Sequence, residues 1–253
     1  MTRDRALLEV EGVSKNFGAL AALAGISLTV RPGEVFSVIG PNGAGKSTLF
    51  NVISGLHAPT SGRVLFKGED ITDLGPEVIN RRGLAKTFQI TNIFPGISVY
   101  DNVRVAAQSR ARVSGRLLSL WRLPDVDGPV MELLDAFGLS ARRDDLAENL
   151  SHGEQRYLEL CLALATEPAL LLLDEPTAGM TPGETKDATA LIRRIAQSRR
   201  LTVLLIEHDM SVVMGISDRI AVLHFGEKIA EGSPEAIRSD PLVIDAYLGG
   251  AED

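Results

Sequence analysis

The sequence contains very little cysteine and needs none to hold its fold. The single cysteine, Cys161, excludes an intramolecular disulfide framework and suits a reducing cytoplasm. It lies in the mostly apolar run 158–165, which favours a buried structural thiol over a reactive one. A chain of 253 residues can bury about 70–75% of its unfolded surface, so a hydrophobic core is enough to stabilise it.

Long hydrophobic runs and excess positive charge are also missing. Apolar runs such as 169–173 and 203–206 fall far short of the roughly 20 residues that a transmembrane helix needs. No signal-peptide apolar core follows residues 1–5, so we expect no export signal and at most a peripheral membrane role. The formal net charge of −7 argues against a broad nucleic-acid-binding face, and we expect no nucleic-acid partner.

A glycine-rich stretch near the N-terminus carries the strongest functional signal. The apolar residues 35–39 predict a buried strand, and the residues from Ser47 onward predict a helix. Between these elements, Gly40, Gly45 and Lys46 complete with Ser47 the spacing of a phosphate-binding loop, G-x-x-x-x-G-K-[ST]. Glycines let successive backbone N–H groups face one point, where the helix start adds partial positive charge.

This loop predicts that the chain binds a nucleoside triphosphate together with Mg²⁺. Lys46 is long enough to reach the outer phosphates, and the Ser47 hydroxyl can ligate the metal. A glycine turn that binds nothing is disfavoured, because the pattern falls between a strand and a helix. The residues expected to contact the nucleotide are Asn42, Gly43, Ala44, Gly45, Lys46, Ser47 and Thr48.

Two acidic residues follow a second apolar run, 170–173, which is typical of a strand buried on both faces. A carboxylate at Asp174 is expected to face the Mg²⁺ held by Ser47. Adjacent residues at a strand end point in opposite directions, so Glu175 is expected to orient and deprotonate the attacking water. A surface turn would also contain two acids, but the phosphate-binding loop upstream favours the catalytic interpretation.

The segment 150–155 predicts the start of a helix. Ser151 and Glu154 have the spacing of a capping box, in which each side chain accepts a backbone N–H of the other residue. A capped helix start with a serine hydroxyl and Gly153 is equally suited to bind an anion. Both interpretations use the same groups and both stay open.

The remaining sequence alternates predicted strands and helices. Further strands are expected at 7–10, 26–30, 63–66, 84–88, 201–206, 219–225 and 228–231. Short helices are expected at 76–82 and after Ser233 and Asp240. Phe17 falls in a turn-like setting between the first two strands and fits a small core cluster.

A mostly helical block, 92–165, interrupts this alternation and is interpreted as an insertion in an α/β core. Asp101 and Asn102 are expected to cap one helix, and a second is expected at 130–137. The segment 102–124 carries no acid but five arginines, Arg104, Arg110, Arg112, Arg116 and Arg122. A solvated or partner-facing helix accounts for them, as does attraction to phospholipid headgroups, and we favour the first.

Taken together, these motifs resemble those of an ABC-transporter ATPase. The resemblance covers essentially the whole chain, with the motifs in the family's order: P-loop at 40–47, Q-loop at Gln89, signature motif at 150–155, Walker B at 170–175 and switch histidine at His208. It implies one domain, 1–253, with an α/β P-loop NTPase core whose sheet is mostly parallel. It further implies an N-terminal antiparallel β subdomain, a helical insertion at 92–165 and a helical tail at 233–253.

The resemblance also implies roles for individual residues. Phe17 would stack on adenine, and Ser151, Gly153 and Glu154 would contact ATP held by a second subunit. The implied catalytic residues are Glu175, His208 and Gln89, and the implied Mg²⁺ ligands are Ser47, Gln89 and Asp174. For His208, a histidine satisfied within the core is the competing interpretation. His152 and Thr181 depart from the common family pattern, which weakens the inference of cross-dimer contacts at Thr181.

Partners follow from the same resemblance. It implies a head-to-tail dimer with an identical or paralogous ATPase, docking of the helical block on integral membrane permease subunits, and an extracytoplasmic solute-binding protein reached through the permease. The location would be peripheral, at the cytoplasmic face of the inner membrane. Segments 82–89, 206–210 and 247–249 resemble the ATPases of branched-chain amino-acid importers, with urea importers and the lipopolysaccharide-export ATPase as close alternatives.

Two other functional classes compete with a transport ATPase. Regulatory or repair ABC proteins that act on nucleic acid usually carry two cassettes or a long coiled coil, whereas this chain has one cassette, no heptad run and a negative charge. A small-molecule kinase would share the P-loop but would leave the segment 151–155 and His208 unexplained. Both classes are therefore less favoured.

Overall fold

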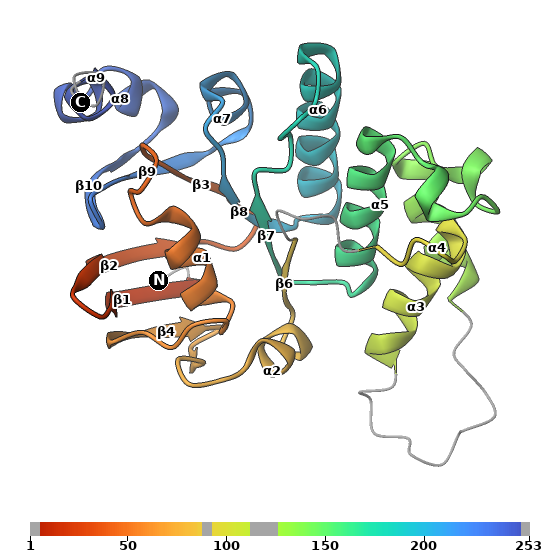
Figure 1. Cartoon of the computed structure of the whole chain (residues 1–253), viewed down its shortest axis with the longest axis horizontal. Coiled ribbons are helices and arrows are strands. Elements are labelled where there is room, and N and C mark those ends of the chain that lie inside the picture. Colours follow the sequence, from red (N-terminus) through yellow and green to blue (C-terminus); the bar gives the residue numbers. More distant parts are fainter. Residues whose placement is uncertain (1–5, 88–92, 112–125, 249–253) are drawn as a thin grey trace, which may run out of the picture.

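The computed structural model describes residues 6–87, 93–111 and 126–248. Within these ranges the chain forms a central six-stranded sheet, a smaller four-stranded sheet and helices packed around them (Figure 1). The predictions for Gln89 and for Arg112, Arg116 and Arg122 lie outside the described residues.

The central sheet has the strand order β10-β9-β3-β8-β7-β6, and β10 alone among these strands runs antiparallel to its neighbour. All residues of β3, β7 and β8 are buried, because helices cover both faces of a parallel sheet. Val38 and Asp174 both pair with Ile206, so β3, β7 and β8 end at the same edge. The strand bounds are β3 Val35–Ile39, β6 Leu84–Lys86, β7 Leu170–Asp174, β8 Thr202–Ile206, β9 Arg219–His224 and β10 Glu227–Gly232.

The four-stranded sheet is antiparallel, in the order β2-β1-β4-β5. Its strands are β1 Leu8–Phe17, β2 Leu20–Val30, β4 Ser61–Phe66 and β5 Glu69–Asp70. Phe17 is the last residue of β1 and not part of a turn, which corrects the prediction for this segment. The first strand was predicted too short because register shifts after Val10 and Val13 break its alternation of apolar and polar residues.

Helices on the two faces of the central sheet form separate hydrophobic clusters. Helix α1 packs with the β1–β2 side, where Phe50 joins Leu172 and Leu204. Helices α5 and α6 pack on the opposite face with Leu171 and Val203. The helix bounds are α1 Lys46–Ile53, α2 Pro76–Arg81, α3 Val99–Ala111, α4 Asp127–Ala136, α5 His152–Ala165, α6 Pro182–Arg199, α7 Met210–Ile216, α8 Pro234–Arg238 and α9 Pro241–Leu248.

Helices α3, α4 and α5 contact one another at one end of the molecule (Figure 1). Asp101 and Asn102 do not cap α3, since the helix begins at Val99 and both residues lie inside it. Asn102 is fully buried, and its side chain accepts from the Phe94 N–H and donates to the Phe94 carbonyl, 2.8 and 3.0 Å. Its amide therefore ties the preceding loop to α3.

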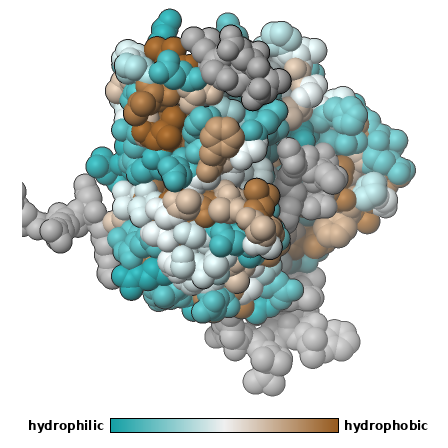
Figure 2. All heavy atoms as spheres, turned by 60° about the vertical axis from the view of Figure 1, so that its left-hand side comes forward, coloured by the Kyte–Doolittle hydropathy of each residue, from teal (hydrophilic) through white to brown (hydrophobic). Residues whose placement is uncertain are grey.

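The C-terminal helices cover the end of β3. Ile237 of α8 and Val243 of α9 pack with Ile39, the residue just before the glycine-rich loop. Leu242 and Ile244 of α9 stay exposed, and Figure 2 shows hydrophobic residues gathered at the height of α8 and α9. The whole arrangement confirms the predicted fold class of a mostly parallel α/β core with an antiparallel β sheet. In the ranges described, no helix combines the length and apolarity that crossing a membrane requires.

Candidate active site

Two glycines of the loop are fixed by close packing of backbone. Gly40 has a φ of 151°, and a Cβ there would lie 2.1 Å from the Leu223 carbonyl oxygen. Gly45 has a φ of 98°, and a Cβ there would lie 2.6 Å from the Ala22 carbonyl oxygen. Since no side chain fits at either place, the loop lies directly against β9 and β2 and has a defined shape.

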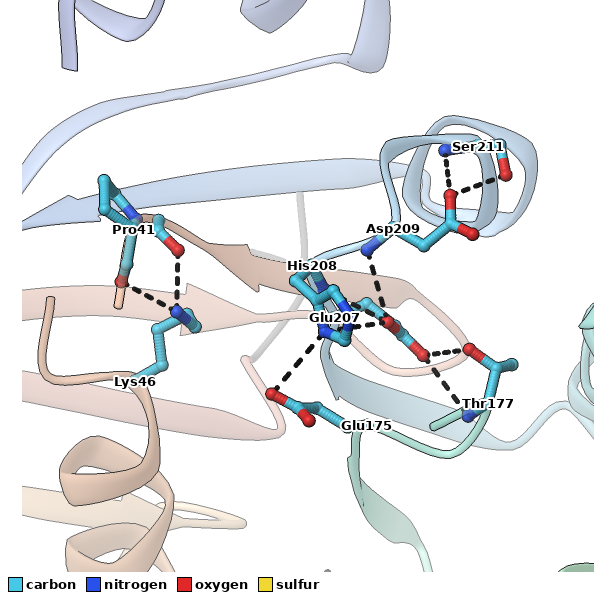
Figure 3. A network of polar contacts seen from close by, with 9 residues as sticks. Pro41, Lys46, Glu175, Thr177, Glu207, His208, Asp209 and Ser211 are labelled. Carbon is cyan, nitrogen blue, oxygen red and sulfur yellow. Dashed lines mark hydrogen bonds and ion pairs between the residues drawn. The ribbon is translucent and has the colours of Figure 1, made fainter. Parts of the chain in front are cut away.

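Lys46 opens α1 and turns back across this loop. Its ammonium donates to the carbonyls of Gly40 and Pro41 at 2.6 and 2.9 Å (Figure 3). Burial lowers the pKa of Lys46, although the nearby Glu175 and Asp174 carboxylates oppose that shift. No side chain caps α1 at Gly45, so no capping side chain occupies the first-turn amides, which can bind an anion.

Asp174 ends β7 beside the loop in a largely buried position. Its Oδ2 is 3.9 Å from the Lys86 ammonium, which donates to the Asn51 side-chain oxygen at 2.7 Å. Burial raises the pKa of Asp174, while the charge of Lys86 opposes this rise. The Asp174 Oδ1 is buried without a hydrogen-bond partner. An orphaned carboxylate oxygen close to Lys46, whose neighbour Ser47 is exposed, fits a site for a hard divalent cation.

Lys86 is a site residue that sequence reasoning missed. It lies in the short strand β6, whose Lys86 pairs with Leu172 of β7. The sequence signal that could have indicated a role was the presence of a lysine inside the short predicted strand 84–88. Its position bridges α1 and β7, so it holds Asp174 toward the phosphate-binding loop.

Glu175 follows Asp174 in a left-handed conformation, with a φ of 50°. A non-glycine residue rarely adopts this backbone, and such residues cluster at functional sites. The turn brings the Glu175 carboxylate to 3.7 Å from the Nδ1 atom of His208, at the end of β8 (Figure 3). The structure thus brings together Glu175, predicted to act on the attacking water, and His208, predicted as a second catalytic residue.

His208 is exposed, so its ring is not a satisfied core residue. The residue before it, Glu207, is fully buried and contacts Thr177, a pair that sequence reasoning also missed. Only the acidic character of Glu207 at a strand end could have signalled a role.

Phe17 presents a half-exposed ring at the end of β1. The ring meets His57 edge-on, with centroids 5.5 Å apart, and the Lys15 ammonium lies 5.0 Å from its centroid. His57 follows α1 shortly after the phosphate-binding loop. An aromatic face with a nearby cation is suited to stack on a base.

Ser151 is the N-cap of α5, and the predicted capping box with Glu154 is present. The Ser151 N–H donates to Glu154 Oε2 at 2.8 Å, and the Glu154 N–H donates to Ser151 Oγ at 3.3 Å. Helices α5 and α1 pack on opposite faces of the central sheet. One chain therefore does not place Ser151 in the site formed by its own phosphate-binding loop.

Comparisons with known proteins decide which family this geometry belongs to. Residues 23–178 match the family model described as ABC transporter. The chain belongs to the ABC transporter family. This confirms the resemblance predicted from the motifs and makes the chain an ABC-type ATPase. Residues 227–253 further match the model described as branched-chain amino acid ATP-binding cassette transporter.

Similar proteins cover nearly the whole chain. The high-affinity branched-chain amino acid transport ATP-binding protein LivG of Escherichia coli (strain K12) is 41% identical over 97% of this chain and 98% of its own. A crystal structure of the ADP conformation of an ABC-transporter cassette has a TM-score of 0.83 and 33% identity, covering 97% of this chain and 99% of its own. A dimeric cassette in a post-hydrolysis state bound to ADP and Pi has a TM-score of 0.76 and 26% identity, covering 90% and 98%.

Proposed function

We propose that this chain hydrolyses ATP to power an importer of branched-chain or related amino acids. The observation that carries the proposal is the 41% identity to LivG over nearly the full length of both chains. The match of 227–253 to the branched-chain amino acid cassette model supports the same substrate class. Urea import and lipopolysaccharide export are less favoured because neither is named among these relatives.

The test is to purify the chain with its native membrane subunits and measure transport-coupled ATP hydrolysis. Stimulation by branched-chain amino acids and not by urea or lipid is the expected result. Stimulation by urea or lipid alone would overturn the substrate class while leaving the ATPase intact.

At the site, the first-turn amides of α1 and the Lys46 ammonium would hold the phosphates. Ser47, Asp174 and Gln89 would ligate Mg²⁺, which supplies positive charge to the developing negative charge on the phosphate oxygens when bound. Glu175 would orient the attacking water and accept its proton. His208 would donate to the γ-phosphate from the facing strand end and hold Glu175 in place.

We further propose that the working unit is a dimer attached to membrane permease subunits. Because Ser151 lies on the opposite face of the sheet from α1, it would serve the nucleotide of a partner, either a second copy or a paralogue. The dimeric cassette bound to ADP and Pi supports such an assembly. The permease would hold the chain at the cytoplasmic face of the inner membrane and connect it to an extracytoplasmic solute-binding protein.

Replacing Phe17 by alanine is expected to weaken ATP binding by about 1 kcal/mol or more, the scale of base–aromatic stacking. The ring is half-exposed at a strand end, so the fold should be retained. Isothermal titration calorimetry with ATP measures the effect. Phe94→Ala, which removes another exposed ring, is the matched control. Unchanged affinity in Phe17→Ala would contradict adenine stacking.

Ser151→Ala is expected to leave ATP affinity of the monomer intact but to reduce ATP-dependent dimerisation and hydrolysis. The reason is that Ser151 would contact the nucleotide of the partner and not that of its own chain. Calorimetry on dilute protein reports the first quantity, and size-exclusion chromatography with ATP and an ATPase assay report the others.

Loss of the cap alone would instead lower the free energy of unfolding by about 1 kcal/mol and spare cooperative hydrolysis. Ser233→Ala separates these effects, because Ser233 caps α8 with a bond of the same length, 3.3 Å from its Oγ to the Ala236 N–H. If the two variants behave alike, Ser151 acts only as a cap.

A further inference from the structure

The buried carboxylate of Glu207 joins the two segments that carry Glu175 and His208. Glu207 directly follows the last residue of β8, and it has no exposed surface. Its Oε1 accepts from the N–H of Thr177 at 3.3 Å and also from the Thr177 hydroxyl. Its Oε2 accepts from the N–H groups of His208 and Asp209 at 3.0 and 3.4 Å (Figure 3).

In all four of these hydrogen bonds the Glu207 carboxylate is the acceptor. A buried carboxylate is costly unless hydrogen bonds replace its hydration, and donors from both segments do so here. Thr177 is itself buried, so this bridge is shielded from water. The four bonds connect only two places in the chain, the turn after β7 and the turn after β8. What they fix is the distance between these turns.

The turn after β7 needs such support. Glu175 has a left-handed backbone that persists only where the surroundings hold it, with a φ of 50°. Its N–H donates to the Ile206 carbonyl at 2.9 Å, and Thr177, two residues on, bonds to Glu207. Ile206, the last residue of β8, and Glu207, which follows it, therefore secure both sides of the strained residue.

The turn after β8 is held by hydrogen bonds to the same carboxylate. His208 Nδ1 lies 3.8 Å from Glu207 Oε2 and 3.7 Å from Glu175 Oε1, so the ring lies between the two acids (Figure 3). The ring is exposed and carries little packing of its own. Its position depends on the backbone that Glu207 holds.

We infer that Glu207 is a positioning residue for hydrolysis, whose bonds to Thr177 and to the His208–Asp209 backbone set where Glu175 and His208 face each other. The inference rests on the proposed function of those two residues. Glu207 touches no reacting atom. Its role is to hold Glu175, which would accept the proton of the water, and His208, which would donate a hydrogen bond to the γ-phosphate, in a fixed relative position.

Glu207→Gln tests this positioning role, because the nitrogen of the amide side chain cannot accept a hydrogen bond. With its oxygen toward His208 and Asp209, the amide NH₂ can donate to the Thr177 hydroxyl but leaves the Thr177 N–H without an acceptor. We expect kcat to fall by about 100-fold, the cost of a misplaced catalytic group, with the nucleotide Kd unchanged. Thr177→Val should lose about tenfold in kcat, the effect of one hydrogen bond to a charged group, and Thr177→Ser should restore it.

A double variant separates positioning from stability. If Glu207 acts through Glu175, then Glu207→Gln combined with Glu175→Gln will be no slower than Glu175→Gln alone. Glu159→Gln is the control for removing a buried carboxylate elsewhere, since Glu159 accepts from Arg156 within α5 at 3.0 Å. That control should lower the melting temperature without lowering kcat.

Two results would overturn the inference: a native kcat in Glu207→Gln, or a loss that multiplies with that of Glu175→Gln. If Glu207→Gln fails to fold, equal kcat in Thr177→Val and Thr177→Ser overturns it instead. A native chain that hydrolyses no ATP when assembled with its membrane subunits would refute the proposed function itself. That outcome differs from a native chain that is active and insensitive to Glu207→Gln.

Discussion

Lys46→Ala is expected to reduce ATP hydrolysis by about 10²- to 10³-fold and to weaken triphosphate binding along with it. Lys46 is a buried ammonium at the start of α1, held by the carbonyls of Gly40 and Pro41. Burial lowers its pKa, because desolvation disfavours the cation more than the nearby Glu175 and Asp174 carboxylates favour it. A phosphate anion would supply the missing counter-charge, so alanine should remove a charge-assisted contact that no neighbour replaces.

Calorimetry with ATP and a steady-state ATPase assay measure the two effects. Circular dichroism checks the fold, because the alanine leaves the Gly40 and Pro41 carbonyls without this donor. Lys228→Ala is the matched control, since that lysine forms a local ion pair with Glu231 on β10. Near-native hydrolysis by Lys46→Ala would contradict the role of the loop as a phosphate site.

Several elements were predictable because local sequence decides them. The runs 170–173 and 203–206 are continuously apolar, a pattern typical of short strands buried on both faces. Val38 and Asp174 pair with the same residue, Ile206, so these strands end at one edge of the sheet together with β3. The capping boxes at Ser151 and Thr181 are equally local and are both present.

Other features depend on residues distant in sequence and could not be predicted. Register shifts in β1 place successive apolar residues on unexpected faces, which hid the length of the strand and the place of Phe17. Asparagine is a residue type that often caps helices. Here, however, the Asn102 side chain bonds to the backbone of Phe94 in the preceding loop, and Asn102 lies inside α3. The residue types alone do not distinguish a strand end from a turn, or a helix interior from a helix cap.

The polar contacts behind the site were missed for the same reason. Lys86 reaches Asp174 because β6 and β7 are neighbours in the sheet, although the two residues lie far apart in the sequence. Thr177 and Glu207 meet because β7 and β8 are neighbours and end together. A sequence pattern records each polar residue but not the strand order that pairs it.

Glu175→Gln is expected to stop chemistry while sparing ATP binding. The amide keeps the shape of the carboxylate but cannot take a proton from water, and loss of a general base typically costs about 10²- to 10⁴-fold in kcat. Lys46, Ser47 and Asp174 remain to hold the nucleotide. Each bound ATP would then bridge one loop to the partner's signature serine and would not be cleared, so the dimer should accumulate by mass action.

Size-exclusion chromatography of Glu175→Gln with and without ATP measures this accumulation, and a single-turnover assay measures the chemical step. His208→Ala should behave similarly, because the ring lies 3.7 Å from the Glu175 carboxylate and would lose its hold on the γ-phosphate. Glu235→Gln, which changes an exposed glutamate on α8, should form the dimer only transiently and turn over normally. If Glu175→Gln stays monomeric at high ATP or hydrolyses ATP at the native rate, another group must accept the proton, and the strained turn after β7 serves a different purpose.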